Sequence, residues 1–128
     1  MTGVASEVAG SEEGSALQWQ IPSAAHNLVG PVPNGGNILS PVIPAPGWQK
    51  GAVGLTSTQA GQISVQRYID AAGTVPVGAP LTAALVATVA NWVSWQDGVP
   101  YGSFRITVTN TGGAPATLTN VAVLLQTG

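Results

Sequence analysis

Residues 104–109 read FRITVT, and this short stretch indicates the fold class most directly. Apolar and polar side chains alternate through it, which is the period of a β-strand with one buried face. The run ISVQRYID at residues 63–70 alternates in the same way, although Arg67 interrupts its apolar side. We expect the Arg67 guanidinium to reach a sheet edge or to pair with a carboxylate. The side chains of the first stretch that we expect to be buried are Phe104, Ile106 and Val108.

Further short strands are expected around these two. Residues 51–57 and 74–77 fit strands, and residues 117–125 return as a partner strand after the glycine-containing loop NTGGAP at residues 110–115. Residues 81–96 are ambiguous, because their apolar positions fit a helix in the first half and a strand in the second. Four β-branched residues between Val86 and Val93 favour a strand in the second half. We expect strands at 81–87 and 88–96, and Asp97-Gly98 then predicts a turn.

This pattern of six or seven short strands contains no alternating βαβ rhythm. It predicts an all-β fold, an antiparallel β-sandwich of the immunoglobulin-like or jelly-roll-like kind, over residues 51–128. Residues 1–16 are small and acidic and predict a flexible terminus. Residues 17–50 hold six of the ten prolines, so a helix should not cross them and a central strand should not either. Because this proline-rich segment is also apolar, we expect an extended arm that lies on the sandwich and on neighbouring subunits.

Composition excludes several classes of protein. Three basic residues in 128 cannot neutralise a nucleic-acid backbone, and zero cysteines exclude disulfides and cysteine-ligated metals. No apolar run is long enough for a membrane-spanning helix, and no signal peptide is evident at the start of the chain. Only 6% of the residues are charged, so the surface is solvated by neutral polar groups or is covered by partner subunits.

No constellation of residues points to catalysis or to a cofactor. His26 is the only histidine and is remote in sequence from Asp70 and Asp97, so we expect a solvated or interface histidine and no catalytic triad. Asp70 and Asp97 are the only candidates for a glycosidase pair, and each is better explained by a turn or strand end. Calcium and transition-metal spacings are also missing. We therefore expect no catalytic, cofactor or metal residues, and no enzyme.

The tryptophans are the stronger candidates for a contact surface. Trp92 and Trp95 lie three residues apart, so a strand would point one into the core and the other outward, beside Tyr101. An outward tryptophan serves either as a partner contact or as a platform for a sugar. Trp19 and Trp48 flank the proline-rich segment and can anchor its two ends. The candidate interface residues are Trp19, Trp48, Ile38, Leu39, Trp92, Trp95 and Tyr101.

Three stretches carry a resemblance to a known class of protein. ISVQRYIDAAGTVPVG at residues 63–78, WQDGVPYGSFRITVTNTGG at residues 95–113 and TLTNVAVLLQ at residues 117–126 resemble small head proteins of tailed bacteriophages. The match lies in the composition, which is rich in Gly, Ala, Thr and Val and has almost no charge, and it covers about half of the chain. The C-terminal hairpin also resembles immunoglobulin-like modules of bacterial surface proteins.

The resemblance implies a capsid decoration or cement protein on the virion surface, which stabilises the phage head through contacts between subunits. Its partners would be the major capsid protein and copies of itself, as a homo-oligomer for which a trimer is one option, without nucleic acid or membrane. The alternative is a tail-associated or surface β-sandwich that recognises a receptor or a carbohydrate. That alternative predicts a concave patch built on Trp92 or Trp95 with Tyr101.

Overall fold

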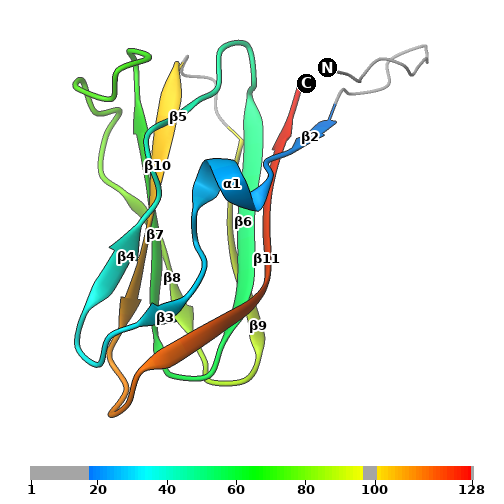
Figure 1. Ribbon diagram of the computed structural model, residues 1–128. Helices are drawn as coiled ribbons and strands as arrows, with labels where there is room; N and C mark the ends of the chain where they lie inside the picture. The colour runs from blue at the N-terminus through cyan, green and yellow to red at the C-terminus, as the bar shows by residue number, and fades with distance from the viewer. Residues whose placement is uncertain (1–17, 97–100, 128) are drawn as a thin grey trace.

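The computed structural model describes residues 18–96 and 101–127. Within these residues the chain forms two antiparallel sheets that pack face to face as a β-sandwich (Figure 1). The acidic terminus at residues 1–16 and the Asp97-Gly98 turn lie outside the described residues. The elements are β2 (Gln18–Gln20), α1 (Ser23–His26), β3 (Pro31–Val32), β4 (Asn37–Leu39), β5 (Ile43–Pro44), β6 (Lys50–Ser57), β7 (Gly61–Tyr68), β8 (Leu81–Leu85), β9 (Ala90–Gln96), β10 (Ser103–Asn110) and β11 (Ala116–Gln126).

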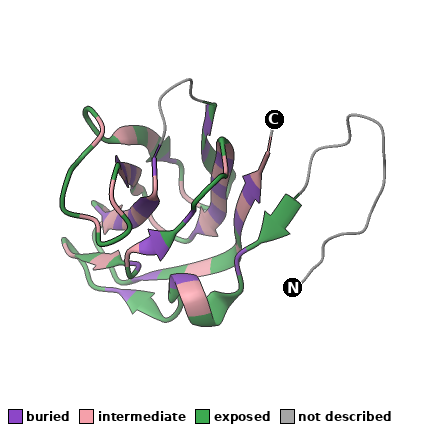
Figure 2. Ribbon diagram, turned by 90° about the horizontal axis from the view of Figure 1, so that it is seen from above, coloured by how far each residue is buried: buried purple, intermediate pink, exposed green. Residues whose placement is uncertain are grey.

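Each sheet is built on a pair of long strands and completed by short ones. One sheet has the order β4-β10-β7-β8, with β5 also paired to β10, and the other has the order β2-β11-β6-β9, with β3 also paired to β11. The fold class predicted from alternation is therefore confirmed as an all-β, two-sheet antiparallel sandwich of the jelly-roll-like kind. Buried and exposed bands follow one another along the strands in Figure 2, as the two-residue period requires.

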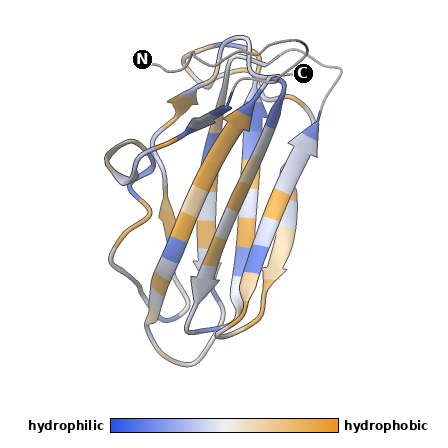
Figure 3. Ribbon diagram, turned by 90° about the vertical axis from the view of Figure 1, so that its right-hand side faces the viewer, coloured by the Kyte–Doolittle hydropathy of each residue, from blue (hydrophilic) through white to orange (hydrophobic). Residues whose placement is uncertain are grey.

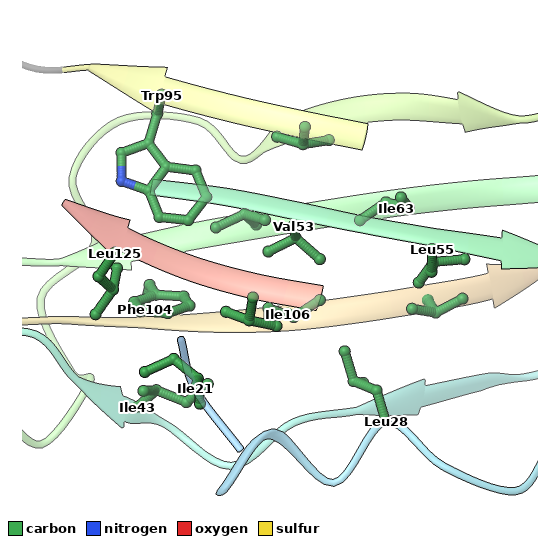
Figure 4. Packing of buried hydrophobic residues seen from close by; sticks show 14 of the residues in the cluster. Ile21, Leu28, Ile43, Val53, Leu55, Ile63, Trp95, Phe104, Ile106 and Leu125 are labelled. Atoms are coloured by element: carbon green, nitrogen blue, oxygen red, sulfur yellow. The ribbon is translucent and has the colours of Figure 1, made fainter. Parts of the chain in front are cut away.

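The core fills the space between the two sheets. Phe104 and Ile106 are fully buried and Val108 nearly so, as the FRITVT stretch predicts, and they meet Val53 and Leu55 from the opposite sheet (Figure 4). Each fully buried side chain of this size contributes roughly 1.5–3 kcal/mol relative to exposure. Burial between two sheets is therefore what holds this nearly chargeless chain together.

The proline-rich segment supplies the outer strands of the same sandwich. β2 and β3 pair with β11, while β4 and β5 pair with β10, so residues 18–44 run along one side of both sheets. Ile21, Leu28 and Ile43 from this segment are buried in the common core and enter it from the open side between the sheets (Figure 4). Pro31 and Pro44 are tolerated in β3 and β5 because these are short edge strands.

A single helical turn, α1, lies between Pro22 and Asn27, and Pro22 stands before the first helical residue, where it costs no hydrogen bond. As expected, no helix among the described residues crosses the proline-rich segment. Two local expectations need correction. Residues 86–89 form a turn instead of continuing the strands, since Thr88 has φ of 66° and donates its N–H to the Ser57 carbonyl. The strand expected at residues 74–77 is reduced to one isolated bridge between Tyr68 and Pro76.

Candidate binding face

The sheet β2-β11-β6-β9 has a solvent-facing side that we call the Trp92 face. Paired residues of neighbouring strands project to the same side, so the register defines rows across the sheet. One row is Trp92, Gly54 and Ala122; the next is Ser94, Ala52 and Leu124; the third is Gln96, Lys50 and Gln126. Figure 3 turns this side of the molecule toward the viewer, with polar and apolar bands following each other along the strands.

Trp92 dominates this face. Its side chain is 66% exposed, more than any other large apolar residue that the structure describes. Its neighbours in the row are Gly54 and Ala122, the two smallest side chain types, so no side chain of that row stands above the indole. A bare indole on a flat sheet is available to stack against a ligand or a partner.

A shallow hollow lies one row along from Trp92. Its volume is about 310 Å³, and it is lined by Ala52, Ser94 and Leu124, by the three polar residues of the third row, and by Gly51 and Trp95, which lie between these two rows in β6 and β9. Residues two apart in a strand are about 6.6 Å apart, so the hollow begins beside the indole. Lys50 is the only charged side chain among the described residues of the three rows, and amide and hydroxyl groups supply the remaining hydrogen-bonding capacity.

Trp92 and Trp95 point to opposite sides of β9, as their three-residue spacing predicts. Tyr101 lies beside the buried Trp95 and not beside the exposed Trp92. Trp95 is 6% exposed and donates its indole N–H to the Tyr101 hydroxyl at 3.0 Å inside the core. Its ring lies 5.4 Å from that of Phe104. The concave patch expected from Trp92 or Trp95 with Tyr101 is therefore wrong, because both Trp95 and Tyr101 are buried and only Trp92 faces the solvent.

The core also accommodates the polar groups near Tyr101. Arg67 is almost fully buried on the inner side of β7, and burial lowers the pKa of its guanidinium despite the opposing effect of Tyr101. Burial likewise raises the pKa of Tyr101, although the hydrogen bond from Trp95 lowers it in part. Tyr101 is thus one neighbour of the Arg67 guanidinium, and the expected pairing with a carboxylate stays a prediction.

The other candidate interface residues lie away from the Trp92 face. Trp19 and Trp48 bring the two ends of the proline-rich segment together, with ring centroids 6.3 Å apart. Trp19 lies opposite the buried Leu125 in the register, which places it on the inner side of β2, at the margin of the sheet. Ile38 packs partly against the core, while Leu39 is exposed on the outer side of the opposite sheet.

Two titratable groups considered for catalysis, Asp70 and His26, accept local hydrogen bonds. The Asp70 carboxylate accepts hydrogen bonds from the backbone N–H groups of Thr74 and Val75 and from the Thr74 hydroxyl, and these bonds lower its pKa to about 2. His26 is buried, so the solvated histidine is wrong. Its Nδ1 accepts the N–H of Leu28 at 3.0 Å, and burial lowers its pKa.

The described residues contain no cluster of three or more metal-ligating side chains. Neither do they include a helix with the length and apolarity that a bilayer crossing requires. Asp97, the second carboxylate considered for glycoside hydrolysis, lies outside the described residues.

Sequence reasoning missed most of the Trp92 face. Lys50, Gln96 and Gln126 come from three strands that are far apart in sequence, so no local motif connects them. Gly54 and Ala122 matter only because the register sets them beside Trp92. The available signal was the alternation of residues 90–96, which puts Trp92, Ser94 and Gln96 on one side of a strand and Trp95 on the other; the structure shows that the Trp92 side faces the solvent.

Comparison with solved structures finds the same sandwich architecture in proteins of diverse kinds. A subunit of Bacillus endospore appendages, described as disulfide-linked pili, is 8% identical over 95% of this chain and 97% of its own, with a TM-score of 0.46. The C-terminal CBM6 of LamC from Zobellia galactanivorans is 15% identical over 84% of this chain and 98% of its own, also with a TM-score of 0.46. PirA is 16% identical over 91% and 96%, with a TM-score of 0.43.

No protein-family model matches the chain, and no curated protein matches it. The structural likenesses concern the fold alone. The resemblance to phage head proteins stays a prediction.

Proposed function

We propose that this protein is a binding module that holds a neutral carbohydrate on the Trp92 face. The observation that supports this most strongly is the 66% exposure of Trp92 on a flat sheet, with Gly54 and Ala122 as its row neighbours. Trp95, the other large aromatic residue of β9, is an apolar residue of the core. Trp92 adds nothing to that core, because its indole is exposed on the solvent side of the sheet.

The chemistry of the face suits a sugar ring. One side of a pyranose presents C–H groups, which stack on the apolar face of an indole, while its hydroxyls require donors and acceptors nearby. Ser94 and Gln96 on β9 and Gln126 on β11 border the hollow beside Trp92 and offer both. Lys50 is the only charge among the described residues of the face, and one cation is too few to neutralise a polyanion, whereas the amide and hydroxyl groups suit a neutral ligand.

The size of the ligand limits the affinity. A disaccharide has about 23 non-hydrogen atoms, and a limit of about 0.3 kcal/mol per atom gives a binding free energy no stronger than about −7 kcal/mol, or a Kd no lower than about 10 µM. A single hexose, with half as many atoms, would bind in the millimolar range. Useful attachment therefore needs an oligosaccharide or several copies of the module.

The test is a screen of neutral oligosaccharides on an array, followed by calorimetry with the best ligand. Trp92→Ala should weaken binding at least tenfold, and Trp92→Phe should retain much of it, because a ring remains available for stacking. Trp19→Ala is the matched control, since it removes an indole on the inner side of the same sheet. Equal affinities for the wild type and Trp92→Ala, or no glycan bound, would contradict the proposal.

A second candidate is the capsid decoration protein. What favours it is that large apolar side chains are exposed on several sides of a chain with few charges, among them Leu39, Ile69, Val86 and Trp92. Copies of this chain at fixed stoichiometry in purified phage heads, measured by mass spectrometry, would support it. Because residues 18–48 carry part of the core, removing them would unfold the module, so a truncation test is limited to residues 1–16.

A further inference from the structure

The edge strands on the two sides of the sandwich differ in length and in composition. On one side, β2, β3, β4 and β5 are strands of two or three residues, and β3 and β5 each contain a proline. Short strands and prolines are devices by which proteins prevent a sheet edge from pairing with another chain. On the other side, the edges are β8 and β9, and neither contains proline or charge.

β9 is the least protected edge strand in the described part of the chain. It has seven residues, ANWVSWQ, and pairs with β6 alone. All seven of its register partners run continuously along β6, so no bulge twists the strand away. A long, uncharged, regular edge leaves a row of backbone N–H and C=O groups ready to accept another strand.

The side chains of β9 make a second copy of β9 the best occupant. Antiparallel pairing about a two-fold axis at Val93 matches each residue of the strand with one of the other copy: Trp92 with Ser94, and Ala90 with Gln96. The large indole thus meets a small side chain of the other copy, and the large amide meets an alanine. No charge opposes another across the contact, because β9 has none.

We propose that the protein forms a two-fold dimer in which the free edges of two β9 strands pair antiparallel. The two Trp92 faces then join into one continuous surface, because a two-fold axis perpendicular to the sheet keeps both faces on the same side. This inference does not depend on glycan binding. The proposal places the expected self-association at the free edge of β9. It favours dimers over trimers, because each copy has one such edge and pairing two copies occupies both.

Charge variants on β9 test the contact. Ser94 is exposed, and in this register the two copies of position 94 are diagonal neighbours about 7–8 Å apart. Ser94→Glu and Ser94→Lys should each raise the dimer dissociation constant at least tenfold, measured by native mass spectrometry and sedimentation. An equimolar mixture of the two variants should form the heterodimer. Thr119→Glu is the control, because it places the same charge on exposed β11, two strands away, and should leave the dimer intact.

Cysteine pairs test the register, in a chain that has no cysteine of its own. Ala90→Cys mixed with Gln96→Cys should give an intermolecular disulfide on mild oxidation, since opposed residues lie within disulfide reach. Ala90→Cys alone should not, because six residues along a strand separate its two copies by about 20 Å. A wild type that stays monomeric at about 100 µM would overturn the proposal. A dimer that neither Ser94 variant weakens would also overturn it. So would a disulfide that forms as readily with Ala90→Cys alone as with the mixture.

Discussion

Gly51→Ala should destabilise the protein through Trp95. Gly51 lies opposite Trp95 in the register of β6 and β9, and the indole covers the glycine backbone. A Cβ at position 51 would stand 2.1 Å from Cζ2, 2.5 Å from Cε2 and 2.7 Å from Cη2 of the ring. Ordinary contact begins at 3.4 Å, so the ring must move by about 1.3 Å.

The cost follows from what holds the ring in place. Overpacking a core typically costs about 1–3 kcal/mol, and losing the hydrogen bond to Tyr101 adds about 0.5–1.5 kcal/mol. We therefore expect the free energy of unfolding to fall by about 1.5–4.5 kcal/mol, and Tm by about 6–18 °C at roughly 4 °C per kcal/mol. Urea unfolding monitored by tryptophan fluorescence, with a thermal scan by circular dichroism, measures both quantities.

Gly54→Ala is the matched control, because it is three residues further along β6 and on the outer side. A Cβ there meets its nearest atoms at 3.6 Å, so the free energy of unfolding should change by less than about 0.5 kcal/mol. In a Trp95→Phe background, which lacks the benzo ring, Gly51→Ala should cost less than about 1 kcal/mol. Equal effects of the two glycine substitutions, or full additivity with Trp95→Phe, would refute the packing argument.

Three further predictions concern polar groups. Asn110→Ala should lower the free energy of unfolding by about 2–3 kcal/mol in denaturant titrations, because the buried amide donates to three carbonyl groups and accepts the N–H of Gly112. Acid should loosen the loop after β7: the pKa of Asp70 is about 2 in the folded protein against 3.8 unfolded, so its contribution is complete above pH 4 and is lost as the pH falls toward 2. NMR signals of Thr74 and Val75 should follow that titration and lose it in Asp70→Asn. The pKa of His26 is also lowered in the folded state, so stability should fall as the pH drops through the unfolded value of 6.5, and His26→Gln should flatten that part of a Tm-against-pH curve.

The strands of the sandwich were predictable because alternation is local. The alternation in FRITVT and ISVQRYID predicts which side of each strand is buried. β10 confirms the first stretch, and β7 confirms the second as far as Tyr68, with Arg67 turned inward and Ile69 exposed beyond the end of the strand. The same period separated Trp92 from Trp95. Local backbone chemistry also explains the edge positions of Pro31 and Pro44. Hydrophobic burial with a two-residue period is sufficient to define such elements without knowledge of their partners.

Pairing between distant strands was decided only by the tertiary structure. Tyr101 and Phe104 both lie beside Trp95 in the core, and no spacing in the sequence indicates that proximity. The proline-rich segment became part of the sandwich because β10 and β11 offered it free edges and a core to fill. Rows such as Trp92, Gly54 and Ala122 exist only through the register of three strands, since side chains far apart in sequence become neighbours when backbone hydrogen bonds align them.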